Sequence, residues 1–126
     1  MTLHPLKSVF VLPTADLAAV LPFYRDGLGL EVIEEWTELG RGALLCVSED
    51  TELELIEVER VERPSEPRMG IGLEIEDSLV DEIHGRLARL GFRIKGPPEL
   101  RAWGKRGFGA LDPDGVPVNI YGPKRD

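Results

Sequence analysis

Residues 28–33 read Leu-Gly-Leu-Glu-Val-Ile, and residues 90–94 read Leu-Gly-Phe-Arg-Ile. In both segments a glycine, which readily takes the left-handed conformation just past a helix end, precedes a run typical of a strand. The segments belong to a longer repeat, in which Asp16 matches Asp77 and Glu54 matches Asn119. The matched residues lie 61, 62 and 65 positions apart (16 to 77, 29 to 91 and 54 to 119). We therefore expect two copies of one structural module.

Each copy contains one predicted helix near its start. Asp16 and Asp77 are suited to cap these helices, because a carboxylate accepts hydrogen bonds from the free N–H groups of a first turn. The first helix is expected over residues 17–26, with a kink or an early end at Pro22, which lacks a backbone N–H. The second helix is predicted by an apolar stripe at three- and four-residue spacing. The stripe consists of Leu79, Ile83, Leu87 and Leu90.

One strand is expected before each helix and three after it, so each module has the order β-α-β-β-β. Residues 112–115 read Asp-Pro-Asp-Gly and predict a tight turn between the last two strands. Residues 59–68 combine proline with charge and predict an exposed connector. The result is an α+β fold in a single domain, 1–126, with modules at about 6–58 and 69–122. The strands predicted after the helices are 31–35, 42–47, 52–57, 93–95, 107–111 and 116–121.

Strand alternation assigns side chains to the two faces of each predicted sheet. Leu53 and Leu55 are expected to face the first helix, which leaves Glu54 on the opposite face. By the same alternation, Asn119 and Tyr121 lie on the face that points away from the second helix.

The composition narrows the class of partner. The chain of 126 residues contains 23 acidic side chains and 15 Lys or Arg side chains, a formal charge of −8. This excess of acid argues against binding to nucleic acid and to anionic membrane surfaces, since both need a basic protein surface. No apolar run is long enough to cross a bilayer and no signal-peptide-like segment is seen, so a cytoplasmic location is expected. The single cysteine, Cys46, excludes an intramolecular disulfide.

Together with two further segments, the repeat resembles the vicinal oxygen chelate superfamily, which includes glyoxalase I, bleomycin-resistance proteins and extradiol dioxygenases. The segments are Phe-Tyr-Arg-Asp at 23–26, and Trp103-Gly104 followed by the turn at 112–115. The resemblance covers nearly the whole chain. It implies two tandem modules whose curled mixed sheets surround a cavity, with helices on the outer face, and it implies a homodimer. Fold alone does not imply one activity.

The same resemblance implies that enzymes of this family hold a divalent metal ion with His, Glu or Gln from the first and last strands of each module. In this chain the first-strand positions fall near Val9 and Gly70, and the last-strand positions fall at Glu54 and Asn119. Glu54 is the only good ligand among them, whereas a catalytic metal site needs about three protein ligands. We therefore predict no metal, no other cofactor and no catalytic residue.

Without a metal, the resemblance implies a protein of the bleomycin-resistance type, which binds a small molecule without acting on it. Aromatic side chains would stack on a planar, antibiotic-like ligand, and the charge of −8 favours a cationic one. Arg101 and Arg106 could instead pair with a carboxylate on the ligand. The predicted ligand-binding residues are Trp36, Glu54, Trp103, Arg106, Phe108, Asn119 and Tyr121.

Two alternatives stay open from the sequence. One is a lyase, isomerase or dioxygenase of the glyoxalase type with an atypical divalent-metal site around Glu54. The other is a non-catalytic module that binds a partner protein. A metal assay on the purified protein separates the first alternative from the other two hypotheses.

Overall fold

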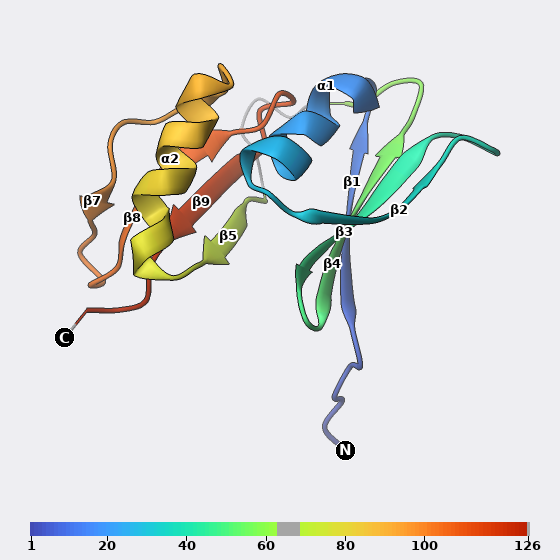
Figure 1. Cartoon of the computed structure of the whole chain (residues 1–126). Coiled ribbons are helices and arrows are strands. Elements are labelled where there is room, and N and C mark those ends of the chain that lie inside the picture. The colour runs from blue at the N-terminus through green and yellow to red at the C-terminus, as the bar shows by residue number, and fades with distance from the viewer. Residues whose placement is uncertain (63–68, 126) are drawn as a thin grey trace. The chain divides into compact units, whose positions relative to one another are not determined.

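The computed structural model describes residues 1–62 and 69–125 and divides the chain into two compact units, Met1–Glu62 and Arg63–Asp126 (Figure 1). Each unit holds one copy of the predicted repeat, as a mixed β-sheet with one α-helix packed on it. The predicted α+β class is therefore confirmed. The single domain over the whole chain stays a prediction, and residues 63–68 of the predicted connector lie outside the described residues.

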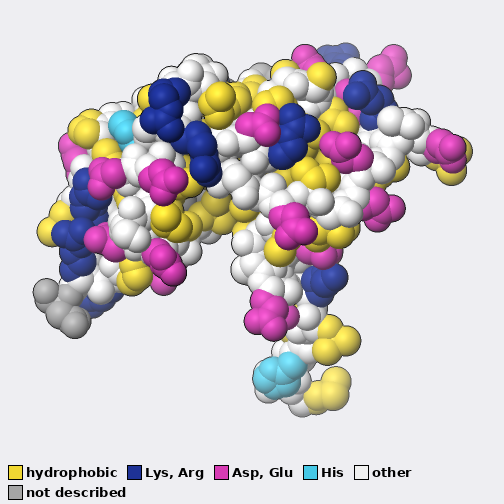
Figure 2. Space-filling model, in the orientation of Figure 1, with side chains coloured by type: hydrophobic (Ala, Val, Ile, Leu, Met, Phe, Trp, Pro, Cys, Tyr) yellow, Lys and Arg dark blue, Asp and Glu magenta, His cyan; other side chains and the backbone are white. Residues whose placement is uncertain are grey.

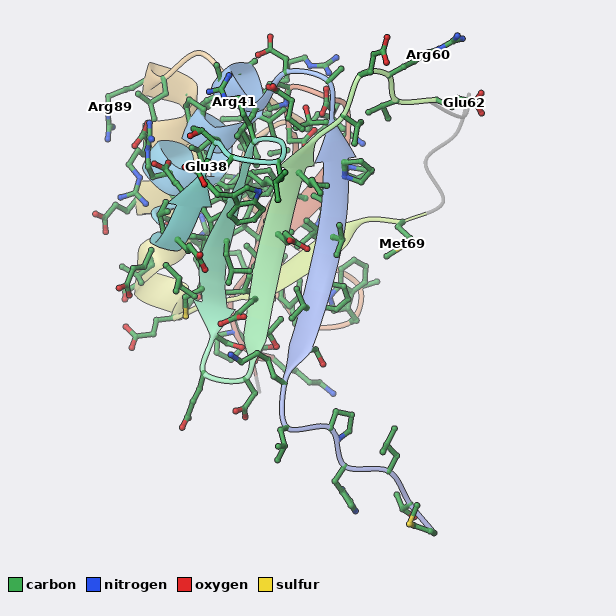
Figure 3. All side chains as sticks on the ribbon, turned by 90° about the vertical axis from the view of Figure 1, so that its right-hand side faces the viewer. Glu38, Arg41, Arg60, Glu62, Met69 and Arg89 are labelled. Atoms are coloured by element: carbon green, nitrogen blue, oxygen red, sulfur yellow. The ribbon has the colours of Figure 1, made fainter. Side chains whose placement is uncertain are left out.

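The first unit contains a four-stranded sheet in the order β1-β4-β3-β2. β1 (Ser8–Thr14) pairs in parallel with β4 (Thr51–Glu57), and the two lie side by side in Figure 3. β3 (Gly42–Ser48) pairs antiparallel with both β4 and β2 (Glu31–Trp36). All three strands predicted after the first helix are present, and each ends within one residue of its expected bounds.

The helix of the first unit, α1 (Leu17–Pro22), starts and ends for the predicted reasons. Asp16 caps it, because its Oδ1 accepts a hydrogen bond from a first-turn N–H at 3.1 Å. The helix ends at Pro22 and continues as a π-helical turn, η1 (Phe23–Gly27), where the Leu28 N–H bonds to the Phe23 carbonyl at 2.9 Å. The expected kink is thus a change of helix type, which follows from the missing proline N–H.

The second unit repeats this topology with the strand order β5-β9-β8-β6. β5 (Ile71–Glu74) is parallel to β9 (Pro117–Tyr121), and β9 is antiparallel to β8 (Arg106–Leu111). β6 (Arg93–Ile94) pairs with one end of β8, and a short strand absent from the prediction, β7 (Glu99–Leu100), pairs with the other. Two residues are too few to give an alternation pattern, so sequence periodicity could not reveal β7.

The second helix, α2 (Val80–Arg89), does not begin as predicted. A 3₁₀ turn, η2 (Asp77–Leu79), precedes it, and no side chain caps either segment. The Asp77 carboxylate instead forms an ion pair with Arg125 at 2.7 Å. The predicted cap is therefore wrong, because Asp77 is engaged by a residue that lies 48 positions away in the sequence.

The predicted apolar stripe of the second helix is not buried at either of its ends. Leu79 and Leu90 are 38% and 49% exposed. Leu79 lies in the 3₁₀ turn, which winds more tightly than an α-helix and so moves it away from the packed face. The side chains that α2 buries are Val80, Ile83 and Leu87.

In both units the helix covers one face of the sheet and leaves an open face. Leu53 and Leu55 are buried on the covered face of the first sheet, as predicted. Val118 and Ile120 are buried on the covered face of the second sheet, under α2 (Figure 1). Alternate residues of the same strands point to the open faces, which are the faces that can receive a ligand.

The predicted turn at residues 112–115 is present. The Gly115 N–H donates to the Asp112 carbonyl at 2.8 Å, and Gly115 has φ +85°, which favours glycine. The buried Asp112 carboxylate also accepts two backbone N–H bonds within this turn, at 2.8 and 2.9 Å. No helix in the described part of the chain is long and apolar enough to span a membrane.

Candidate ligand pocket of the second unit

The open face of the first sheet is filled by side chains. In its central row, Glu54 of β4 lies between Val11 of β1 and Leu44 of β3. In the next row, the Trp36 ring packs over Gly42, where a Cβ atom would collide with the indole. Large side chains thus occupy this face, and none of its rows leaves the backbone bare across neighbouring strands.

The open face of the second sheet has smaller residues at the matching positions. Asn119 of β9 lies between Gly72 of β5 and Gly109 of β8. Where the first unit has a valine and a leucine, the second unit therefore has two glycines. Their missing side chains leave room for neighbouring ones, Tyr121 over Gly72 and Lys95 and Asn119 over Gly109.

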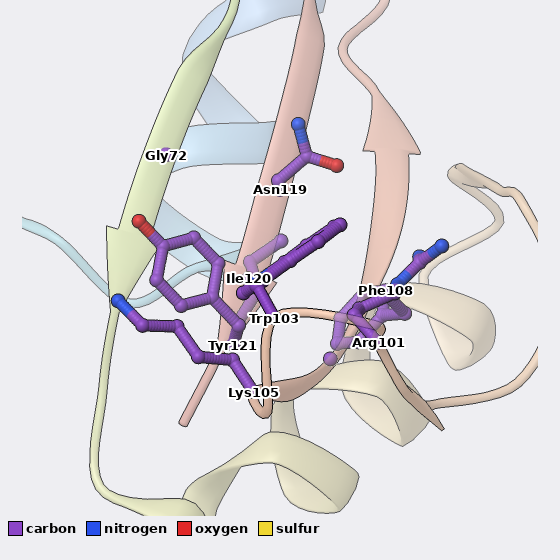
Figure 4. A pocket seen from close by; sticks show the side chains of 9 residues that line it. Gly72, Arg101, Trp103, Lys105, Phe108, Asn119, Ile120 and Tyr121 are labelled. Atoms are coloured by element: carbon purple, nitrogen blue, oxygen red, sulfur yellow. The ribbon is translucent and has the colours of Figure 1, made fainter. Parts of the chain in front are cut away.

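A pocket of about 380 Å³ lies on this open face (Figure 4). We call it the second-unit pocket. Its wall contains the aromatic side chains of Trp103, Phe108 and Tyr121 and the amide of Asn119. It also contains two basic side chains, Arg101 and Lys105. In the view of Figure 4, Tyr121 and Lys105 lie on one side of Trp103 and Arg101 lies on the other.

Glycine is needed on the floor of the second-unit pocket because Tyr121 lies against the strands. A Cβ atom at Gly72 would lie 3.1 Å from the Tyr121 hydroxyl. A Cβ atom at Gly107 would collide with the Tyr121 side chain and with the Ile120 carbonyl oxygen. The two glycines therefore let the phenol ring lie flat on the sheet, where it forms one wall of the pocket.

Trp103 projects from the tip of the β7–β8 hairpin and is 59% exposed. The tip is closed by two backbone bonds, from the Arg101 N–H to the Lys105 carbonyl at 2.8 Å and from the Gly104 N–H to the Arg101 carbonyl at 3.0 Å. The C-terminal segment also holds it, since the Arg125 N–H donates to the Gly104 carbonyl at 2.8 Å. A large apolar ring is thus kept in solvent beside the pocket by an ordered turn.

Lys105 connects the two edges of the second-unit pocket. Its Nζ donates to Glu74 Oε1 at 2.7 Å and lies 5.0 Å from the centroid of the Tyr121 ring. The hydrogen bond to Glu74 raises the pKa of Lys105, so the ammonium is charged at neutral pH.

Two predicted ligand-binding residues lie on the covered face instead. Phe108 is 1% exposed, and its ring meets the His84 ring of α2 edge-on at 4.9 Å. Arg106 forms a two-pronged pair with Asp81 of α2, with both N···O distances at 2.9 Å. Phe108 also lines the pocket, from within the core, and its role in ligand binding stays a prediction. Arg106 is engaged with the helix.

The other predicted residues divide between the units. Trp103, Asn119 and Tyr121 come together in the second-unit pocket. Trp36 and Glu54 lie on the open face of the first sheet. The sequence analysis did not select Lys105 or Gly72, although alternation along β8 places residues 105, 107 and 109 on one face.

The net charge is divided very unequally between the units. Residues 1–62 contain 13 acidic and 4 basic side chains, a formal charge of −9. Residues 63–126 contain 10 acidic and 11 basic side chains, a formal charge of +1. Figure 2 shows both kinds of side chain on the face in view. The overall charge of −8 therefore does not describe the unit that carries the pocket.

The side chains present do not fit a catalytic metal. Among residues 1–62 and 69–125, no group of three or more His, Cys, Asp or Glu side chains is arranged to hold a metal ion. Val11 lies opposite Glu54 and Gly72 lies opposite Asn119, two residues beyond the first-strand positions predicted, and neither has a donor atom. About three protein ligands are needed, so Glu54 lacks the companions that a catalytic site requires.

Comparison with known proteins places this geometry in a family. The model described as the glyoxalase/bleomycin resistance protein/dioxygenase superfamily matches residues 7–120. A search of curated proteins finds no match.

Solved structures share the fold. The crystal structure of SMU.1112c is 26% identical in sequence, with a TM-score of 0.77, and the match covers 95% of this chain and 99% of that one. The fosfomycin resistance protein FosX from Listeria monocytogenes is 20% identical, with a TM-score of 0.75 and coverage of 95% and 91%. Lactoylglutathione lyase from Agrobacterium tumefaciens is 22% identical, with a TM-score of 0.66 and coverage of 91% of both chains.

Proposed function

Because this chain belongs to the glyoxalase/bleomycin resistance protein/dioxygenase superfamily, we propose that it binds a small molecule with a planar ring in the second-unit pocket, without a resident metal. One observation carries the proposal. Trp103 is 59% exposed at the tip of the β7–β8 hairpin, and it lines the pocket together with Tyr121 and Gly72 (Figure 4). An exposed indole at a pocket edge is costly to solvate, and a ligand ring stacked on it removes apolar area from water.

The binding proposal does not require chemistry on the ligand. Neighbours with the same fold include proteins named as a fosfomycin resistance protein and as a lyase, and at their low identity they support the fold alone. A metal-dependent activity around Glu54 is the alternative. It is disfavoured by the donor set of the described residues, and metal analysis of the purified protein with a Glu54→Ala control would test it. A homodimer also remains a prediction, which sedimentation would test.

The binding proposal is tested directly by a variant whose added side chain fills part of the pocket. Gly72→Val places a branched side chain against the Tyr121 hydroxyl, and the hydroxyl lies at the movable end of its side chain. Planar aromatic acids, amides and amines would be screened against both proteins by ligand-observed NMR. We expect binding to the native protein with a Kd of about 1 mM or tighter, weakened about tenfold or more in the variant.

The matched control is Gly85→Ala on α2, where an added Cβ meets only the mobile end of Arg89. This variant should bind the same molecules with unchanged affinity, and its helix should gain about 0.5–1 kcal/mol of stability. Equal binding by the native and Gly72→Val proteins, or no binding across the panel, would contradict the proposed function.

A further inference from the structure

We infer that the ligand of the second-unit pocket carries an anionic group, such as a carboxylate, beside its planar ring, and that Arg101 and Lys105 receive it. This inference rests on the proposed function. It reverses the cationic ligand that the overall charge of the chain favours.

The wall of the second-unit pocket is basic. Arg101 and Lys105 line the pocket, and no acidic side chain does. No ion-pair partner of the Arg101 guanidinium is found among residues 1–62 and 69–125. A guanidinium at a pocket wall offers paired N–H donors in the geometry that a carboxylate accepts.

Lys105 can exchange its ion-pair partner, Glu74, for a carboxylate on a ligand. Its side chain is 30% exposed and that of Glu74 is 48% exposed, so water reaches both ends of their ion pair. Ion pairs at such exposed sites are weak. An arriving carboxylate can therefore share the Lys105 ammonium, which has three N–H donors and uses one on Glu74.

A cation is disfavoured at the ring face of Tyr121. Aromatic ring faces bind cations, and Tyr121 presents such a face. Lys105 Nζ already occupies it, at 5.0 Å from the ring centroid. A cationic ligand would meet that ammonium at short range, where like charges repel.

The remaining charges on this open face agree with the inference. Lys95 lies over Gly109, since its Cδ would be 3.5 Å from a Cβ atom added there. Glu99 pairs with Gly107 across the β7–β8 ladder and lies on the same face, outside the pocket wall. Arg93 pairs with Leu111 and lies on this face as well. With Arg101, Lys105 and Glu74, the described part of the face carries four basic and two acidic groups.

The experiment uses three ligands with one ring and three charges: indole-3-acetate, indole-3-acetamide and tryptamine. Their dissociation constants for the full chain would be measured by titration calorimetry at low ionic strength. Indole-3-acetate should bind about threefold more tightly than the amide and about tenfold more tightly than the amine, as expected for partly exposed charge pairs. Added salt should narrow these differences.

Two opposite variants make the test sharper. Lys105→Gln should weaken the binding of indole-3-acetate by about threefold, because one receiving cation is lost. Glu74→Gln should strengthen it by about threefold, because the competing carboxylate is lost. Glu82→Gln removes the same charge from an exposed position of α2 and should change neither binding constant nor ligand order.

The outcomes separate this inference from the proposed function. If the amide or the amine binds as tightly as indole-3-acetate, or if Glu74→Gln and Glu82→Gln behave alike, the anionic group is wrong and a ring-binding pocket stands. If none of the three ligands binds to the native protein and the aromatic panel also fails, both proposals are wrong.

Discussion

The two units have the same topology, and their open faces carry different side chains. The central row of the first sheet has bulky side chains on both sides of Glu54, whereas the row through Asn119 has Gly72 and Gly109 on its flanks. In both units a glycine lies against an aromatic side chain, Gly42 against Trp36 and Gly107 against Tyr121. The difference shows how two copies of one repeat can keep the same backbone topology and present different surfaces.

The formal net charge also differs between the two units. The first unit carries a formal charge of −9 and the second a formal charge of +1. An acidic unit favours solubility of the whole chain, whereas the charge of the pocket wall comes from the residues that line it. The composition of one half can thus mislead about the ligand of the other half.

The largest effect should separate two aromatic residues of the second unit, Phe108 and Trp103. Phe108→Ala should lower the free energy of unfolding by about 3–5 kcal/mol, because it empties a fully buried site next to His84. Trp103→Ala should change it by about 0.5 kcal/mol or less, as for other exposed positions, and should weaken ring binding. Denaturant unfolding and ligand titration of both variants measure the two properties. Similar stability losses would contradict the assignment of these rings to opposite faces.

A smaller effect should appear at Gly42 and Gly107, which occupy matching positions in the two units. Gly42→Ala and Gly107→Ala each force a methyl group against an aromatic side chain and a backbone carbonyl. Each should lose about 1–3 kcal/mol of stability, the usual cost of overpacking. Thermal unfolding of both variants measures it. In the first unit, adding Trp36→Ala should restore part of the stability lost in Gly42→Ala, because it removes the ring with which the new methyl group collides. If no stability is restored, the Trp36 ring is not the cause of the loss.

The smallest effect should come from Arg106 and is best seen as a titration. The guanidinium of Arg106, through its hydrogen bonds, lowers the pKa of Asp81. Because the folded-state pKa is lowered, the pair stabilises the fold above the ordinary aspartate pKa and loses that effect as the pH falls through the lowered value. Arg106→Gln should raise the pKa of Asp81 in NMR titrations, with little change in ligand binding.

Arg101→Gln is the matched comparison, since it removes the same charge from the pocket wall. It should weaken binding of an aromatic acid by about threefold and leave the pKa of Asp81 in place. If the two variants exchange these effects, the assignment of Arg106 to the helix and Arg101 to the pocket is wrong.

Much of the fold could be predicted because short-range chemistry controls it. Asp16, Pro22 and the turn at 112–115 act through their own backbone, and strand alternation fixed the faces of Leu53 and Leu55. Predictions failed where a distant residue decides the outcome. The Asp77 carboxylate forms an ion pair with Arg125 and caps no helix. The two-residue strand β7 is recognised only by its pairing with β8.

The site was predicted less completely, for two reasons. Alternation along β8 already places Phe108 with Ala110 on the apolar face, but its aromatic side chain suggested a ligand contact. Lys105 gains its place from Glu74 and Tyr121, and these contacts depend on strand register that no local pattern specifies.

The central claim is that the ligand ring meets Trp103 on the second unit and not Trp36 on the first. The chain has two tryptophans, so a ¹⁵N-labelled sample gives two indole N–H signals, which Trp36→Phe and Trp103→Phe would assign. Titration with indole-3-acetate should shift the Trp103 signal in a saturable way and leave the Trp36 signal in place. A saturable shift of Trp36 with Trp103 unmoved would contradict the account.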